Sequence, residues 1–486
     1  MMHSAFRFFL LSLLVLTLAS AASAQWSSDP MQNLALSNIP GADQVQPKVL
    51  PLPNNSWYVS WFNNNPNDPP PNGYDVYYQL LDPNGYEQFP HDGIQVAKLT
   101  LSSTEDYGLD ADAGGNALLA FLDDRRDPDN PQVTAVKMSP TGQPLWGASG
   151  IALTFDPGFH ASPKITATSD GFVVVAWTTN SAVILQKLDS NGHPLWVGKT
   201  AFDYGVTLQE SGFNYLLSDL HAADDGSVIV SWVRNKGFGS NNYLYANKLS
   251  ADGKLLWGAG HVKVYDGGSL QFGEFPYFTT DGSGGAVFSW YTSSPSLQVF
   301  AQHILSDGTE AFGHNGAVGS TNQFNVRVSP SASYNPATQE TFLFWTEEDS
   351  NQVENGVSGQ KFNSAGARQW TDTGVVIVPL GSDSQIWVEN VQLGTGALVF
   401  WVDSPGFGSG TLYAAKLDGN GNFLCSQFGV STASADKFRL FAGIASSGLA
   451  AVAWEDDRNG ENDIFIQNVN SDCTLGIEDR LHRARR

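Results

Sequence analysis

The chain has 486 residues with a formal net charge of −23, and only 15% of its residues are charged. Such a surface repels phosphate backbones, so nucleic acid is excluded as a partner. Hydrophobic residues make up 42% of the chain, which is enough for a large core and argues against disorder.

The first residues have the pattern of a signal peptide. Arg7 precedes an apolar run from Phe8 to Leu18, and small residues follow up to Ala24. We expect residues 1–24 to be removed and the mature protein to be secreted, periplasmic or held at the cell surface. The alternative is an uncleaved anchor, but the run is shorter than the roughly 20 residues that a membrane span needs. No later stretch is apolar for that length, so no integral membrane segment is expected after cleavage.

Eight apolar runs that end in an aromatic residue form the primary repeat. They recur every 53 to 60 residues, which is typical of a repeat architecture. Their closing residues are Trp61, Phe121, Trp177, Trp232, Trp290, Trp345, Trp401 and Trp454.

A second run follows each of these and keeps its own offsets. Five copies have glutamine at one register: Gln79, Gln186, Gln302, Gln360 and Gln467. Six residues later comes a turn glycine: Gly85, Gly142, Gly192, Gly253, Gly308, Gly366 and Gly421. Four residues after the glycine comes an aromatic residue: Phe89, Trp146, Trp196, Trp257, Phe312 and Trp370. Cys425 takes the aromatic register in the seventh copy, and Cys473 takes the glycine register in the eighth.

These runs predict an all-β fold. They are rich in Val, Ile, Leu, Tyr and Trp, and Gly, Asn, Asp and Pro separate them, as in strands and turns. Each unit accommodates four strands, the innermost of which often opens at a proline (Pro47, Pro163 and Pro276). We therefore predict one eight-bladed β-propeller over residues 25–477. The last unit has no outer strand, so the N-terminal segment with Trp26 is expected to complete it and close the ring. A linear array or two smaller propellers are the alternatives.

Two corners of the repeat resemble known propeller families. The segments SADGKLLW (Ser250 to Trp257) and DSNGHPLW (Asp189 to Trp196) resemble the tryptophan-docking repeat of quinoprotein-like propellers. They also resemble, more loosely, the Asp-box of sialidase-like propellers, and residues 453–467 resemble a repeat of secreted bacterial propeller proteins. The resemblance implies the fold, but not an activity. The vicinal disulfide of the quinoproteins is missing, and no arginines match the sialidase triad.

Acidic loops follow three of the aromatic runs, at residues 123–129, 347–349 and 455–458. Carboxylate oxygens suit Ca²⁺, although the spacing of a calcium loop is missing. The alternative is a solvated rim in which Arg125 and Arg458 pair with neighbouring carboxylates, and such a face could also attract a basic partner. No cofactor is required by the sequence. The candidate calcium ligands are Asp123, Asp124, Asp127, Glu455, Asp456 and Asp457.

Aromatic residues gather in loops that lead into the inner strands. Such side chains stack on sugar rings or anchor peptides, and equally well fill gaps between blades. The candidate ligand-binding residues are Phe155, Phe159, His160, Phe272, Phe275 and Tyr277. Histidine spacing gives no zinc motif, and no nucleophile or phosphate-binding motif is present.

The only two cysteines, Cys425 and Cys473, leave a disulfide open. Export favours the bond, and closing this loop would stabilise the protein by about 4 kcal/mol in the chain-entropy model. Their registers differ by four residues, however, which argues for a Cα separation above the ~7 Å limit.

The last residues, 478–486, form a basic tail on an acidic protein. It is either a frayed terminus or a segment that docks on the acidic rim or on another anionic surface. Taken together, the sequence favours an exported, non-catalytic binding or scaffold propeller with a protein or glycan ligand at its loop-rich acidic face. The alternatives are a glycan hydrolase or lyase with a central site, and a structural component of an envelope or matrix.

Overall fold

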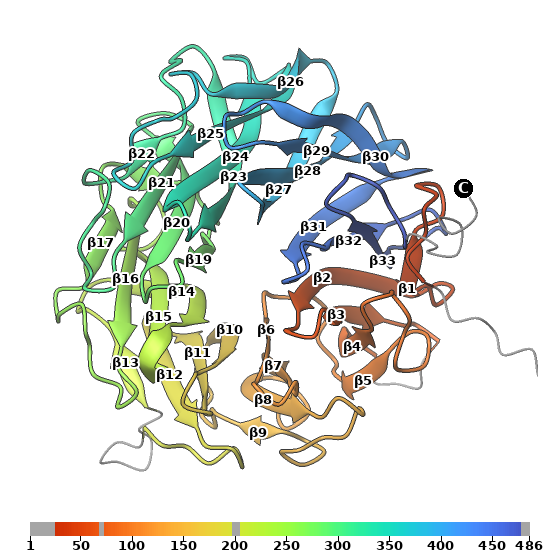
Figure 1. Cartoon of the computed structure of the whole chain (residues 1–486). Coiled ribbons are helices and arrows are strands. Elements are labelled where there is room, and N and C mark those ends of the chain that lie inside the picture. The colour runs from red at the N-terminus through yellow and green to blue at the C-terminus, as the bar shows by residue number, and fades with distance from the viewer. Residues whose placement is uncertain (1–24, 68–71, 197–204, 478–486) are drawn as a thin grey trace, which may run out of the picture.

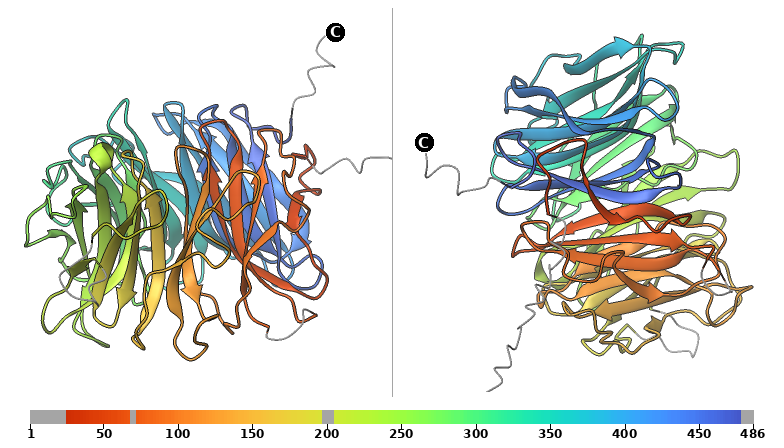
Figure 2. Two further views of the ribbon diagram at one scale, coloured as in Figure 1. Left: turned by 90° about the horizontal axis from the view of Figure 1, so that it is seen from below. Right: turned by 90° about the vertical axis from the view of Figure 1, so that its right-hand side faces the viewer.

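The structure is a computed structural model that describes residues 25–67, 72–196 and 205–477. The predicted signal peptide and basic tail lie outside these residues. Eight β-sheets stand around a central axis, so the fold is the predicted eight-bladed β-propeller (Figure 1). The strands run between the two faces of a flattened ring (Figure 2). In the described part of the chain, no helix is long and apolar enough to cross a membrane.

Each of the first four blades is a four-stranded antiparallel sheet, ordered from the axis outward. Blade one consists of β2 (Asp43–Pro51), β3 (Trp57–Asn64), β4 (Asp75–Leu81) and β5 (Ile94–Ala97). Blade two consists of β6 (Gly108–Ala111), β7 (Ala117–Asp123), β8 (Gln132–Met138) and β9 (Ile151–Ala152). Blade three consists of β10 (His160–Ala167), β11 (Val173–Thr179), β12 (Ala182–Leu188) and β13 (Val206–Leu208). Blade four consists of β14 (Asn214–Ala222), β15 (Val228–Asn235), β16 (Tyr243–Leu249) and β17 (Val262–Tyr265), with the 3-10 turn η1 (Asp224–Gly226) between its first two strands.

The other four blades follow the same order, and blade five has an inner strand in two pieces. Blade five consists of β18 (Ser269–Leu270) and β19 (Phe278–Thr280), both paired with β20 (Ala286–Ser294), then β21 (Gln298–Ile304) and β22 (Ala317–Val318). Blade six consists of β23 (Val326–Asn335), β24 (Glu340–Glu348), β25 (Asn355–Phe362) and β26 (Val375–Gly381). Blade seven consists of β27 (Ser384–Leu393), β28 (Gly396–Ser404), β29 (Gly410–Leu417) and β30 (Phe423–Ala435). Blade eight consists of β31 (Lys437–Ile444), β32 (Ala450–Asp456), β33 (Asp463–Val469) and the N-terminal β1 (Leu34–Ser37).

The repeated glutamine fastens the third strand of a blade to the turn that follows it. In blade one, Gln79 Oε1 accepts hydrogen bonds from the backbone N–H of Leu80 and Phe89, and its Nε2 donates to the Pro90 carbonyl. Asn247 makes the equivalent contacts with Trp257 and Gly258 in blade four. A buried amide needs such partners, and the turn after the third strand supplies them.

The second aromatic register packs against the turn glycine of the next blade. An added Cβ would lie 2.7 Å from the Trp26 ring at Gly85 and 2.7 Å from the Trp257 ring at Gly308, so no side chain fits at these positions. All seven turn glycines also have φ between +76° and +85°, which glycine adopts without steric cost. Five indoles complete the contact by donating to a carbonyl two residues before that glycine: Trp26 to Pro83, Trp146 to Ser190, Trp196 to Ala251, Trp257 to Ser306 and Trp370 to Gly419.

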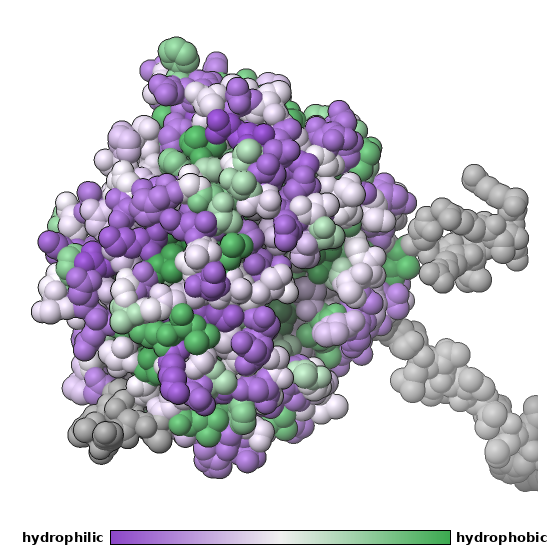
Figure 3. All heavy atoms as spheres, turned by 60° about the vertical axis from the view of Figure 1, so that its left-hand side comes forward, coloured by the Kyte–Doolittle hydropathy of each residue, from purple (hydrophilic) through white to green (hydrophobic). Residues whose placement is uncertain are grey.

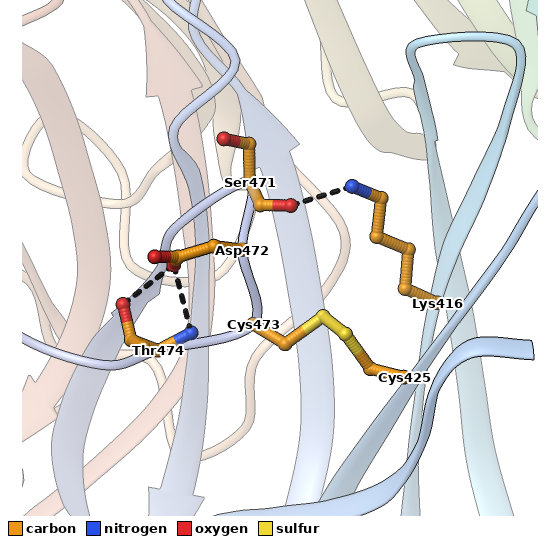
Figure 4. Close-up of a disulfide and its surroundings, with 6 residues drawn as sticks. All are labelled: Lys416, Cys425, Ser471, Asp472, Cys473 and Thr474. Carbon is orange, nitrogen blue, oxygen red and sulfur yellow. Dashed lines mark hydrogen bonds between the residues drawn. A yellow bond between two sulfur atoms is a disulfide. The ribbon is translucent and has the colours of Figure 1, made fainter.

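A disulfide takes the place of this contact between blades seven and eight (Figure 4). Cys425 occupies the aromatic register, Cys473 occupies the glycine register with φ +69°, and their Cα atoms are 6.6 Å apart. The offset of four residues therefore does not separate the cysteines. It is the offset that brings neighbouring blades into contact everywhere else in the ring.

The N-terminal segment contacts the blades on both sides of the ring closure, through β1 on one side and Trp26 on the other. Strand β1 pairs antiparallel with β33, with Leu34 opposite Ile466. Trp26 is only 2% exposed and packs on Gly85 of blade one. The last blade and the first blade are therefore both in contact with this one segment.

We expect Trp26→Ala to lower the free energy of unfolding by about 3–5 kcal/mol, because a large buried aromatic side chain is lost. Chemical denaturation with a far-ultraviolet circular dichroism readout measures the change. Phe407→Ala is the matched control, because Phe407 is fully exposed and its loss should change stability by less than about 0.5 kcal/mol. Equal stabilities for the two variants would contradict the role given to Trp26.

Candidate functional site

The inner strands bring one residue of each blade to the same position facing the axis. In seven blades this residue pairs with the one just before the buried aromatic of the second strand, as Lys48 pairs with Ser60 and Glu389 with Phe400. In blade five, Tyr277 takes the position directly before Phe278, which pairs with Phe288. We name this set the axial ring: Lys48, Gly108, Lys164, Asp219, Tyr277, Ser331, Glu389 and Phe441.

A bulge precedes the axial ring in most blades and re-aims the strand. In five of them its first residue has a positive φ that non-glycine residues rarely adopt. Such backbone strain persists only where the surrounding structure imposes it, and it concentrates at functional sites. The five residues are Gln46, Ser162, Ser329, Trp387 and Arg439, with φ between +47° and +57°.

The axial ring lines a pocket of about 770 Å³. Protein sites for small ligands measure roughly 300–1,000 Å³ and combine apolar walls with a few polar groups. All eight residues of the axial ring contribute to the wall. Further side chains that line it are Asp106, Asp110, His221, Glu274, Phe275 and Trp387.

Two lysines and a tyrosine converge on one carboxylate in this pocket. Lys48 Nζ lies 2.7 Å from Asp106 Oδ1, and Lys164 Nζ forms an ion pair with Oδ2 of the same residue. The Tyr277 hydroxyl donates to Asp106 Oδ2 at 2.8 Å. Asp106 belongs to the start of blade two and Tyr277 to blade five, so this contact bridges the axis.

The charges of this network follow from burial and from each other. Burial would raise the pKa of the Asp106 carboxyl, but Lys164 and Lys48 together hold that pKa well below its usual value. Burial, aided by Lys164, lowers the pKa of Lys48. Burial and the Asp106 charge raise the pKa of the Tyr277 hydroxyl well above its usual value, so the tyrosine remains a hydrogen-bond donor at neutral pH.

A histidine and an aspartate form a second pair on blade four. His221 Nε2 lies 3.0 Å from Asp219 Oδ2. Burial opposes the charged form of the histidine, but Asp219 outweighs it and raises the pKa of His221. Burial likewise opposes ionisation of Asp219, while His221 lowers the pKa of that carboxyl. The pair therefore adds a second set of charged groups to the axial wall.

Glu389 is a carboxyl of the axial ring whose pKa lies near neutrality. Burial raises its pKa to about 7, although the Ser331 hydroxyl donates to its Oε2 at 2.9 Å. Trp387, two residues earlier, leaves 40% of its surface exposed beside it. Blade seven therefore offers the pocket an aromatic face and a carboxyl that changes its charge near pH 7.

The six carboxylates proposed from sequence for Ca²⁺ lie in two separate blades and already have partners. Asp123 pairs with Arg125 and Asp456 with Arg458 and Lys437, while Glu455 pairs with Arg439. Asp124 accepts from Thr100, Asp127 from Asn130, and Asp457 from the backbone N–H of Asp436. Within the described ranges, no three His, Cys, Asp or Glu side chains are grouped so as to hold a metal. The geometry gives the calcium hypothesis no support.

The structure divides the six aromatic-loop candidates among different surroundings. Phe275 and Tyr277 line the axial pocket. Phe159 and His160 line a smaller pocket of about 370 Å³ beside blade two. Phe155 and Phe272 are exposed and line neither, and the Phe272 ring contacts Phe238 at 5.8 Å. Figure 3 shows such apolar groups as small clusters on a largely hydrophilic surface.

Sequence reasoning missed most of the axial ring. A usable signal existed, because Lys48 and Lys164 directly follow the inner-strand prolines Pro47 and Pro163. Asp106 and Glu389 do not follow a proline, and only the closed ring brings them to the axis.

No known protein family matches the chain, and no curated protein matches it. Several solved structures are similar in shape at low sequence identity. The Dos1 propeller has a TM-score of 0.47 at 11% identity, over 90% of this chain and 95% of that one. The polysaccharide lyase Uly1 has a TM-score of 0.43 at 11% identity, over 87% and 89%. A mutant of NanB sialidase from Streptococcus pneumoniae has a TM-score of 0.37 at 11% identity, over 92% and 71%.

We expect Glu389→Gln to make stability less dependent on pH. In the folded protein this carboxyl keeps its proton up to about pH 7, whereas in the unfolded chain it loses it near its ordinary value of 4.5. The free energy of unfolding therefore falls as the pH rises from 4.5 to 7, by at most about 3.5 kcal/mol at about 1.4 kcal/mol per pKa unit.

Thermal melting of wild type and variant between pH 4 and 8.5 measures the effect. The variant should gain stability over wild type as the pH rises through this window. Glu354→Gln, on an exposed turn, is the control and should show no such trend. A difference between Glu389→Gln and wild type that stays constant with pH would refute the raised pKa.

Proposed function

We propose that the protein is a binding module and that its axial pocket holds a glycan. The observation that carries the proposal is the axial ring itself. One structural position is repeated eight times, yet its residues differ in charge, size and polarity from blade to blade. A purely structural channel has no need of two lysines, two carboxylates and a tyrosine at equivalent positions.

The mixture of side chains favours a sugar over an apolar ligand. Tyr277, Trp387 and Phe275 leave 51%, 40% and 42% of their surfaces exposed. Sugar rings present C–H faces that stack on aromatic side chains, and hydroxyls that bond to charged groups around them.

The lysine pair supplies spare donors for such a ligand. Each ammonium carries three donors, whereas among the described residues the hydrogen bonds and ion pairs of Lys48 and Lys164 all end on Asp106. A sugar hydroxyl or carboxylate that reaches these ammoniums therefore finds donors without breaking the network.

The proposal includes export, for which the support is the signal-like sequence before Gln25. An exported module of this kind meets glycans outside the cytoplasm. A protein ligand at the same pocket is the competing occupant, and a binding panel separates the two.

We expect Tyr277→Ala and Trp387→Ala to weaken glycan binding about two- to tenfold each, since an aromatic contact is worth about 0.5–1.5 kcal/mol. A panel of neutral and acidic oligosaccharides is screened first, and the best ligand is then measured by titration calorimetry. Phe407→Ala should bind like wild type, and melting curves verify that each variant folds. Absence of any glycan ligand, or binding that both axial variants leave unchanged, would refute the proposal.

A second candidate function, glycan cleavage at the same pocket, is favoured by Glu389 alone. A carboxyl with a pKa of about 7 holds a proton at neutral pH, as a general acid must. If the protein is an enzyme, wild type releases new reducing ends from the bound glycan. Glu389→Gln should then lose at least about a hundredfold in rate, the lower end for general acid catalysis, while it still binds. No product from a glycan that binds would exclude this candidate for that glycan.

A further inference from the structure

Blade two lacks the first half of its inner strand. In blades one, three and seven the inner strand begins before its axial-ring residue. This first part pairs with the residue that follows the buried aromatic of the second strand, as Ala161 pairs with Thr178. In blade two, β6 begins at Gly108 and its first pair is with Ala120. Leu122, the counterpart of Thr178, is therefore left without an inner-strand partner.

The backbone groups of Leu122 point into this gap. Leu122 of β7 lies opposite Val133 of β8. The backbone groups of Val133 point outward, away from β7: its N–H donates to Thr154 Oγ1, and its carbonyl accepts from the Leu153 N–H. In an antiparallel pair, both residues turn their groups toward each other or both turn them away. The N–H and carbonyl of Leu122 thus face inward, and no hydrogen bond from the described residues reaches them there.

Blade five has a similar interruption but closes it. There the Tyr291 N–H donates to Glu274 Oε1 at 2.9 Å, and the Gln271 N–H donates to the Tyr291 carbonyl. Side chain and backbone thus replace the missing strand. Blade two has no such replacement among the described residues, so its edge is open to a partner.

The smaller pocket of about 370 Å³ lies over this open edge and has an acidic, aromatic lining. Leu122 is part of its wall, together with the rings of Phe62, Tyr107 and Phe159. Its carboxylates are Glu105, Asp129 and the lysine-bound Asp106, and no lysine or arginine lines it. Burial lowers the pKa of His160, so this side chain adds no positive charge at neutral pH.

We propose that this gap is a binding site for an extended peptide that carries a lysine. The peptide adds a short strand beside Leu122, with main-chain bonds to its N–H and carbonyl. The lysine ammonium lies among the aromatic rings and beside Glu105, where cation–π contact and charge both favour it. The net charge of −23 on the whole chain attracts a basic segment to this site.

This site is separate from the axial pocket, although the two share Asp106 and Tyr107 in their common wall. The Tyr107 hydroxyl is bonded to Ser60 and to the Gln46 carbonyl, which holds that wall in place. Peptide binding at the gap does not depend on a glycan, so either proposal can fail while the other holds.

Site-resolved amide hydrogen exchange on the whole protein tests the open edge. In the free protein the Leu122 amide should exchange much faster than that of Thr178, its paired counterpart. The probe is a capped seven-residue peptide of alternating valine and threonine with a central lysine. Saturating peptide should slow exchange at Leu122 at least tenfold. A Leu122 amide that is already protected in the free protein would overturn the proposal.

Peptide titrations test the chemistry of recognition. The same peptide with norleucine for lysine, or with N-methylated backbone amides, should bind at least tenfold more weakly. Glu105→Gln should weaken binding of the lysine peptide about tenfold, whereas Glu354→Gln, on an exposed turn, should leave it unchanged. Equal binding of the lysine and norleucine peptides, or equal binding of the N-methylated form, would overturn the proposal, as would the absence of binding.

Discussion

The contact between an aromatic ring of one blade and a turn glycine of the next is the constraint on which this ring depends. It occurs between seven pairs of neighbouring blades, and five of the rings add an indole hydrogen bond to the same turn. The eighth junction replaces it with the disulfide between Cys425 and Cys473. Both versions require a positive φ at the turn, and both hold the outer edge of one blade to its neighbour.

A regular outer ring leaves the inner face free to vary. Because most blades share one inner-strand register, their residues at the axis are placed alike, whatever their chemistry. The protein can therefore hold lysines, carboxylates and aromatics together at the axis without altering the contacts between blades. This separation of scaffold and site is how one fold serves many functions.

The fold could be predicted because its determinants are local and repeated. The aromatic runs, the glutamine register and the turn glycine recur at constant offsets, and the structure gives the glutamine and the glycine definite contacts. The sequence does not decide whether Cys425 and Cys473 form a disulfide, because their different register positions argue for separation within one repeat unit. The bond in fact joins two neighbouring units. The acidic loops suggest metal ligands from sequence alone, whereas the structure pairs Asp123 with Arg125 and Asp456 with Arg458.

The site was less accessible to sequence reasoning because it is built from distant residues. Asp106 and Tyr277 are 171 positions apart, and only closure of the ring brings them within hydrogen-bond distance. The raised pKa of Glu389 depends on burial, which no local pattern records. The open edge at Leu122 is visible only by comparison with the paired strands of the other blades. Tyr277 and Phe275 were identified because exposed aromatics in loops are conspicuous, but their partners were not.

The most direct test of the account is a crystal structure of the mature protein soaked with the tightest-binding oligosaccharide of a glycan panel. The account predicts a sugar in the axial pocket, stacked on Tyr277 or Trp387 and bonded to Lys48 or Lys164. A ligand that is bound only on the outer rim, with the axial pocket unchanged, would contradict it.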